Sequence, residues 1–171
     1  MACLQTLNGI VRDCLSNVGG VRKVYIANKD DVASITITDD AVSAITMEGG
    51  AKFKEYYQKP GRASVTSTPQ FNDANEYAGE SVVLSLSFPR QDATKRLEVA
   101  ALSVAELVVV YQDANGNCWL LGYDNPVQRS GGDATSGQAV GDTNAYALEL
   151  TATENQLPYS VPVAVIEALV G

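Results

Sequence analysis

Val82-Val-Leu-Ser-Leu-Ser-Phe88 is the clearest indication of fold class in this 171-residue chain. Its large apolar residues occupy every second position, and serines fill two of the positions between them. A period of two places the apolar side chains on one face of a β-strand and the serines on the opposite face. A sheet of such strands has one face against the core and the other in water, which is typical of antiparallel sheets.

The same alternation recurs along the chain and predicts a mainly β protein. Turn residues interrupt it at Asp39-Asp40, Gly49-Gly50 and Pro60-Gly61, so we expect the first third to form a meander. A hairpin of residues 107–112 and 118–123 is predicted around Asn115-Gly116, because Asn-Gly supplies the positive φ values of a tight turn. The other expected strands are residues 24–26, 34–38, 42–47, 53–57, 82–88 and 144–153.

One helix is predicted over residues 91–102. Asp92 is suited to cap the free amides at its start. Lys95 and Arg96 are then expected to be solvated or paired with a neighbouring subunit. Four apolar residues recur at helical spacing and predict the face that covers a sheet: Leu97, Ala100, Ala101 and Val104.

Three segments have weaker patterns. Residues 62–80 are mostly polar and contain Pro69, which removes a ladder donor and predicts an edge strand or a long loop. Residues 129–141 are rich in Gly and Ser and predict a mobile loop. Residues 157–166 contain two prolines, so we expect a last edge strand there. The length of residues 1–171 suits one domain with a real core.

The charge composition disfavours several functions. The chain has 12 Lys plus Arg, 20 Asp plus Glu and no His, which gives a net charge of −8. Without His there is no Ser-His-Asp or Cys-His site and no His-ligated zinc, so we expect no enzyme. A negative chain without a long basic run is also repelled by phosphate backbones and anionic membranes.

The acidic excess lies entirely in the second part of the chain. Residues 1–96 carry 11 acids and 11 bases, whereas residues 97–171 carry 9 acids and a single base, Arg129. A block of one sign is either a solvated face or a functional acidic surface, and the composition leaves both interpretations open.

No motif predicts a metal site, a cofactor or a catalytic pair. Gly131-Gly132 lacks the Gly-Lys-Ser/Thr ending of a phosphate-binding loop. Asp113-Ala-Asn-Gly-Asn117 resembles the start of a calcium loop, but Gly116 stands at the fourth position and Asp124 at the twelfth, where Glu is required. The adjacent acids Asp30-Asp31 and Asp39-Asp40 are expected in surface turns.

The cysteines and aromatic residues are expected to have packing roles. Cys3, Cys14 and Cys118 form no CxxC pair, and an odd number cannot all pair within one chain, so a reducing environment is expected. We expect Cys118 in the core and Trp119 and Tyr56-Tyr57 in the core or at an interface, with a sugar platform as the alternative. The sequence shows no signal peptide and no apolar run that spans a bilayer, which predicts a soluble, unexported chain.

Two blocks of the sequence carry a family resemblance. The first is Ala114-Asn-Gly-Asn-Cys-Trp-Leu-Leu-Gly-Tyr-Asp-Asn-Pro-Val127, followed by a Ser/Gly-rich loop with Gly137 and Asp142 and by an alternating strand that ends near Pro158-Tyr159. The second is residues 45–53 with residues 92–98. Together they resemble the major tail (tail tube) proteins of tailed bacteriophages.

This resemblance implies an antiparallel β-sandwich or barrel flanked by one α-helix. It also implies a homo-oligomer of hexameric rings, stacked into a hollow tube that conducts DNA as non-specific cargo and meets other tail proteins. The chain would lie in the virion tail after assembly in the host bacterial cytoplasm, with no cofactor and no membrane. In such proteins a hairpin or loop reaches a neighbouring subunit, and residues 58–80 fit best, with residues 129–141 next. The residues assigned to this arm are Lys59, Pro60, Arg62, Pro69, Phe71 and Tyr77.

The acidic excess then suggests a hypothesis about the bore. A negative wall repels phosphates within about a Debye length of ~8 Å and keeps DNA from binding. The candidate lumen acids are Glu98, Asp113, Asp142, Glu149 and Glu154.

Three alternatives remain open at the level of sequence. The chain could be another phage structural protein, namely a capsid decoration or head-fibre protein or a tail-completion ring. It could be a carbohydrate-binding β-sandwich module that uses Trp119 or Tyr56-Tyr57. The third alternative is a hydrolase with carboxylate chemistry, which requires two close acids in a pocket.

Overall fold

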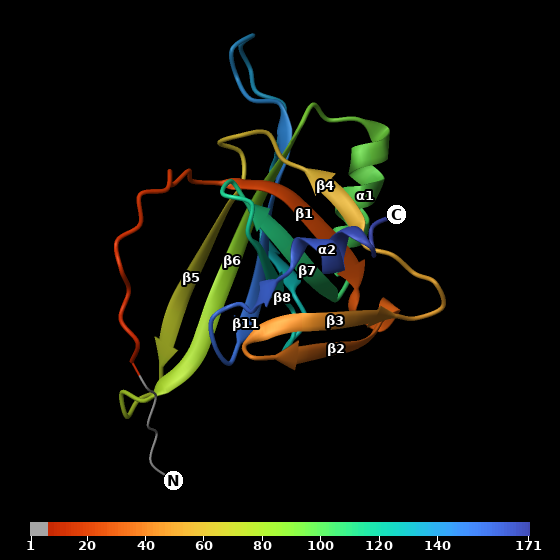
Figure 1. Ribbon diagram of the computed structural model, residues 1–171. Helices are drawn as coiled ribbons and strands as arrows, with labels where there is room; N and C mark the ends of the chain where they lie inside the picture. Colours follow the sequence, from red (N-terminus) through yellow and green to blue (C-terminus); the bar gives the residue numbers. More distant parts are fainter. Residues whose placement is uncertain (1–6) are drawn as a thin grey trace.

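Two β-sheets form the body of the protein in the computed structural model, which describes residues 7–171 (Figure 1). The described helices are α1 (Ala93–Val104), the short α2 (Val163–Glu167) and one 3-10 turn (Lys29–Asp31). The seven-stranded sheet has the order β2 (Val32–Thr38), β3 (Ala41–Met47), β12 (Ser160–Val161), β8 (Cys118–Leu121), β7 (Leu107–Asp113), β1 (Val21–Asn28) and β4 (Lys54–Tyr57). The five-stranded sheet has the order β10 (Ala134–Thr135), β11 (Ala145–Glu154), β6 (Tyr77–Pro89) and β5 (Ser64–Phe71), with β9 (Gln128–Gly131) also paired to β11.

The mainly β prediction is confirmed, and the stretch that begins at Val82 lies in the middle of β6. There β6 pairs antiparallel with β11 on one side and β5 on the other. Leu84 lies opposite Leu150, and both side chains are fully buried, whereas Ser85 is partly exposed. The alternation in the sequence therefore gives each strand one face toward the core and one toward solvent.

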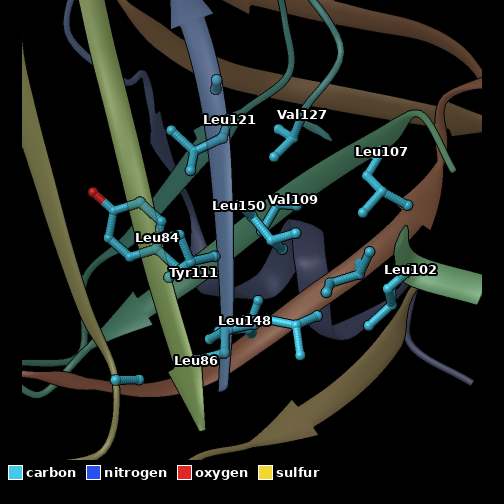
Figure 2. Packing of buried hydrophobic residues seen from close by; sticks show 14 of the residues in the cluster. Leu84, Leu86, Leu102, Leu107, Val109, Tyr111, Leu121, Val127, Leu148 and Leu150 are labelled. Carbon is cyan, nitrogen blue, oxygen red and sulfur yellow. The ribbon is translucent and has the colours of Figure 1, made fainter. Parts of the chain in front are cut away.

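The main hydrophobic core takes side chains from both sheets and from α1 (Figure 2). Leu84, Leu148 and Leu150 come from the five-stranded sheet, and Val109 and Leu121 come from the seven-stranded sheet. A cluster shared in this way ties the two sheets together, because separating them would return all of this apolar surface to water.

A second cluster lies on the opposite face of the seven-stranded sheet. Val108 and Val110 of β7 point into it, together with Ile166 of α2, while Val109 and Tyr111 point into the main core. This two-sided burial explains why β7 reads as a continuous apolar run instead of an alternating one.

Helix α1 begins as predicted, but its buried face is the opposite of the expected one. The carboxylate of Asp92 accepts a hydrogen bond from the backbone N–H of Lys95 at 2.8 Å, which caps the helix. Val99 and Leu102 are the buried residues of α1. On the same side, the Arg129 guanidinium of β9 donates to the Ser103 hydroxyl at 2.5 Å and holds the helix to the sheet.

The prediction that a stripe of four apolar residues on α1 covers a sheet is therefore wrong, because all four residues are exposed. The helix carries apolar residues on two opposite faces, and spacing alone does not say which one meets the sheet. The exposed set is Leu97, Ala100, Ala101 and Val104.

The strand order also corrects three expectations. The first third is not a meander, because β1 pairs with β7 and β4, and only β2 and β3 form a hairpin there.

The expected last edge strand over residues 157–166 is instead the two-residue β12, which lies between β3 and β8 and is followed by α2. Pro158 and Pro162 are compatible with this central position because they flank the two paired residues. Within residues 129–141, β9 and β10 both pair with β11, so only the remainder is a loop.

Candidate functional site

The outer face of the five-stranded sheet is a broad surface of small polar side chains, which we call the polar face. It is formed by the residues of β5, β6 and β11 that alternate with the buried ones. Within β5, β6, β9 and β11, Glu149 is the one acid on this face, because Glu80 and Glu154 are buried and Arg129 bonds to Ser103 of α1. The polar face comprises Ser64, Thr66, Thr68, Ser81, Val83, Ser85, Ser87, Ala147, Glu149, Thr151 and Thr153.

Glu149 lies in the middle of this face. It pairs with Ser85 of β6, which in turn pairs with Ser64 of β5, so one acid and two hydroxyls form a row across the strands. On its other side Glu149 pairs with Gly131 of β9. A Cβ at Gly131 would lie 2.7 Å from Oε2 of Glu149, so glycine leaves room for the carboxylate to rest over the neighbouring strand.

Both edges of the five-stranded sheet are open within residues 7–171. β5 has a neighbour on one side only, and the short β9 and β10 form the other edge beside β11. Pro69 lies on β5, which confirms the prediction of an edge strand. An eight-residue edge with unpaired backbone groups is a template for pairing with another chain.

The predicted arm, residues 58–80, is a β-hairpin strand with a turn at each end. Lys59, Pro60 and Arg62 form the first turn, where Arg62 N–H donates to the Lys59 carbonyl at 3.1 Å. At the other end, Phe71 and Tyr77 lie edge to face with ring centroids 6.2 Å apart. The rings are 61% and 50% exposed, respectively, so the hairpin tip presents an aromatic pair to solvent. The structure thus separates the six arm residues into two groups at opposite ends of β5.

Two of the predicted lumen acids accept hydrogen bonds from backbone N–H groups of local turns. Asp113 Oδ1 accepts from the backbone N–H groups of Asn115 and Asn117, each at 2.9 Å, and shapes the β7–β8 turn. Asp142 Oδ2 accepts from the backbone N–H groups of Gln138 and Ala139 at 2.8 and 2.7 Å. These backbone hydrogen bonds lower the pKa of Asp142. Both acids stabilise local loop structure.

Glu98 lies on α1 and faces the edge of the seven-stranded sheet. Its carboxylate accepts a hydrogen bond from the Tyr56 hydroxyl of β4. Burial and this hydrogen bond together raise the pKa of Tyr56 well above its ordinary value. The pair joins α1 to β4.

The prediction of Glu154 as an acid on an exposed surface is wrong, because its side chain is only 4% exposed and contributes no surface charge. Its oxygens accept from the backbone N–H groups of Gly122 at 2.5 Å and Asp124 at 3.0 Å. Burial raises the pKa of Glu154, while these two hydrogen bonds oppose the shift. Of the five predicted lumen acids, Glu149 is the one on the polar face.

Glu80 is a second buried acid, at 5% exposure, and the sequence analysis does not predict it as a site residue. It accepts from the Ser67 hydroxyl at 2.5 Å and from the Tyr77 hydroxyl at 3.0 Å. The signal that could have found it is its position two residues before Val82, which places it on the inner face of β6.

Residues 136–144 project from the body as an exposed loop (Figure 1, light blue). Val140 at its tip is fully exposed.

No protein family model, curated protein or solved structure matches this chain.

Within the described residues, no three His, Cys, Asp or Glu side chains gather in a way that could hold a metal ion. No helix in that part of the chain is long and apolar enough to cross a membrane.

The aromatic residues proposed as a sugar platform do not form one surface. Tyr56 is half-buried against Phe88, with ring centroids 5.9 Å apart, while its neighbour Tyr57 points to the opposite face of β4 and is exposed. Trp119 is half-buried on β8, separated from β4 by β7 and β1. Cys118 lies in the core as expected, Cys14 is exposed, and Cys3 lies outside the described residues.

Proposed function

We propose that this chain is a structural protein of a bacteriophage virion that forms the hollow tail tube by stacking of hexameric rings. In this proposal the two sheets form the β-sandwich flanked by α1, and the polar face lines the bore. DNA passes through as non-specific cargo, and other tail proteins bind the ends of the tube.

The observation that carries the proposal is the polar face between two open sheet edges. A ring in which β5 of one copy pairs with the β9 and β10 edge of the next would satisfy both sets of backbone groups. Such a contact joins two different surfaces, and a heterologous contact closes into a ring when its rotation allows. The result is a continuous wall whose inner surface is the polar face.

The chemistry of the polar face suits a conduit. Hydroxyl groups keep the wall wetted, and neither Lys nor Arg stands on this face of β5, β6, β9 or β11. Ring symmetry would repeat Glu149 around the bore at one level. A ring of carboxylates repels the phosphate backbone and keeps DNA from binding to the wall.

Two exposed projections support an assembly role. The hairpin tip with Phe71 and Tyr77 and the loop of residues 136–144 leave apolar side chains in solvent in the single chain. Exposed aromatic groups on projecting segments are typical of contacts between proteins.

The test is size-exclusion chromatography and negative-stain electron microscopy of the purified chain. The proposal predicts hollow rods or sixfold rings. A protein that stays monomeric or trimeric at high concentration would contradict it and favour a capsid decoration role. Phe71→Ser, at the hairpin tip, is expected to reduce assembly without changing the melting temperature, and Gln70→Ser on the same strand is the matched control.

A further inference from the structure

Residues 7–18, which we call the N-terminal segment, leave large apolar side chains in water. Leu7, Ile10, Val11 and Leu15 are 93%, 102%, 90% and 81% exposed. Figure 1 shows the segment as an extended red trace outside both sheets. Four large apolar side chains at nearly full exposure in one short segment are unusual in a protein that acts as a monomer.

The order of these residues is that of an amphipathic helix. At 100° per residue, the apolar positions fall within an arc of about 140°, and Asn, Gly, Arg, Asp and Ser fill the rest. Twelve residues are too few to hold a helix in water without a partner, and Gly9 adds to the cost. The helix would therefore form only against another apolar surface. The apolar positions are Leu7, Ile10, Val11, Cys14, Leu15 and Val18.

The exposed stripe of α1 is an apolar surface of matching form. Leu97 and Val104 are 65% and 86% exposed, and Ala100 and Ala101 between them are also exposed. The two alanines allow close approach of a second helix, and the larger residues at each end supply contact area. No described residue of the chain covers this stripe.

We propose that the N-terminal segment of one copy folds into a helix on the exposed stripe of α1 of a second copy, antiparallel to it. The orientation follows from charge. In the antiparallel arrangement Arg12 lies on the side of Glu98 and Asp13 on the side of Arg96, whereas the parallel arrangement brings like charges together. This inference names one contact between copies in the assembly proposed above. It rests on that proposal only because it requires a second copy of the chain.

The partner is a second copy because the C-terminal end of the segment is fixed far from its own α1. Val18 N–H donates to Oδ1 of Asn115 at 2.9 Å, and Nδ2 of Asn115 donates to Oδ1 of Asn17 at 3.1 Å, at the β7–β8 turn. α1 joins β7 at the other end, roughly 20 Å away along the strand. Figure 1 shows the segment and α1 on opposite sides of the molecule.

Cross-linking between two different copies tests the contact directly. The donor copy carries Cys3→Ser and Leu97→Asp, so that Cys14 is its exposed thiol and its own α1 stripe is blocked. The acceptor copy starts at Gly19, which removes its own segment, and carries Ala100→Cys. Mild oxidation of the mixture is expected to give a cross-linked heterodimer, because Cys14 and residue 100 lie on the same side of the antiparallel contact.

Two pairs of matched variants make the result specific. In the donor, Leu15→Asp is expected to abolish the cross-link, and Ser16→Asp, on the polar side, to leave it intact. In the acceptor, Ala44→Cys on the exposed surface of β3 replaces Ala100→Cys and is expected to give no heterodimer. Equal cross-linking at residues 44 and 100, or loss of cross-linking with both segment variants, would overturn the inference.

Gly9→Ala distinguishes a helical contact from an extended one. Gly9 has a φ of +73° in the free chain, a conformation that alanine disfavours. In a helix, alanine is the better residue, so the substitution is expected to tighten association about fivefold. Weaker association would show that the segment does not dock as a helix.

The outcomes separate this inference from the proposed function. Rings or rods of the wild-type chain without the cross-link would overturn the inference and leave the tube proposal standing. A cross-linked heterodimer from a chain that never forms rings or rods would support the inference and contradict the tube proposal. The melting temperature of each variant serves as the folding control, because the exposed segment contributes little to the stability of the single chain.

Discussion

Glu80 and Glu154 lie directly opposite each other on β6 and β11, and both are buried. Each carboxylate has its own donors, hydroxyl groups of Ser67 and Tyr77 for Glu80 and backbone N–H groups for Glu154. Burial raises the pKa of Glu154, and its two backbone hydrogen bonds oppose that shift. The stability of this end of the sheet therefore depends on the protonation state of Glu154.

The raised pKa of Glu154 predicts that its contribution to stability falls as pH rises. Between the ordinary value of 4.5 and the raised value, the folded state binds the proton more tightly than the unfolded state does. The stabilising contribution is complete below pH 4.5 and is lost as the pH passes the folded-state pKa. Glu154→Gln removes this titration, so the wild type should lose stability relative to the variant as the pH rises above 4.5.

Urea denaturation of both proteins at a series of pH values from 4.5 upward measures the effect. The difference between wild type and variant isolates Glu154 from the other acids, whose titrations are common to both. Glu149→Gln on the exposed face of the same strand is the control for the chemical change. A difference in free energy of unfolding that stays constant with pH would show that Glu154 keeps its ordinary pKa.

Gly79 is predicted to be intolerant of a side chain. It has a φ of +120° next to a register shift between β5 and β6, and a methyl group there would meet the carbonyl oxygen of Glu154. Gly79→Ala should therefore destabilise the protein by more than about 1–2 kcal/mol, the ordinary cost of a left-handed backbone for alanine. Gly49→Ala is the comparison, because Gly49 also has a positive φ of 56° but open space around it. Equal melting temperatures for the two variants would contradict the close contact.

The strands were predictable from sequence, because alternation determines which residues of a strand share a face. Val82, Leu84 and Leu86 all point into the core, as their spacing requires. Continuing the same alternation would also have placed Glu80 inside, and the alternation of β11 would have placed Glu154 inside. Both were overlooked because acids are rarely buried.

The pairing order and the orientation of α1 were not predictable. Alternation says nothing of which strand lies next to which, so the position of β12 between β3 and β8 had no signal in the sequence. α1 carries Leu102 on one face and Leu97 on the other, and only the packed structure decides which is buried. The polar face likewise required the register, which brings Ser64, Ser85 and Glu149 into one row.

The contact between the two sheets is predicted to depend on Leu150. This side chain is fully buried in the main core opposite Leu84, between the sheets (Figure 2). Leu150→Ala should cost about 2–5 kcal/mol, from lost burial and from the cavity that remains. Thr153→Ala, at an exposed position of the same strand, should change stability by less than about 0.5 kcal/mol. Denaturant midpoints of the two variants test this, and similar midpoints would mean that the sheets do not share a tightly packed core.

Glu149 provides the sharpest test of the proposed bore. If the polar face lines a tube, Glu149→Lys replaces a ring of carboxylates by a ring of ammonium groups at one level of the wall. Each lysine within reach of a phosphate releases a counterion, so binding of DNA should appear at low salt and fall steeply as salt rises. Assembled wild-type protein should retain no short DNA under the same conditions. Glu48→Lys, which makes the same change at an exposed position after β3, should behave as wild type. Filter retention of labelled DNA by the assembled variants measures this, and equal retention by Glu149→Lys and Glu48→Lys would place Glu149 outside the bore.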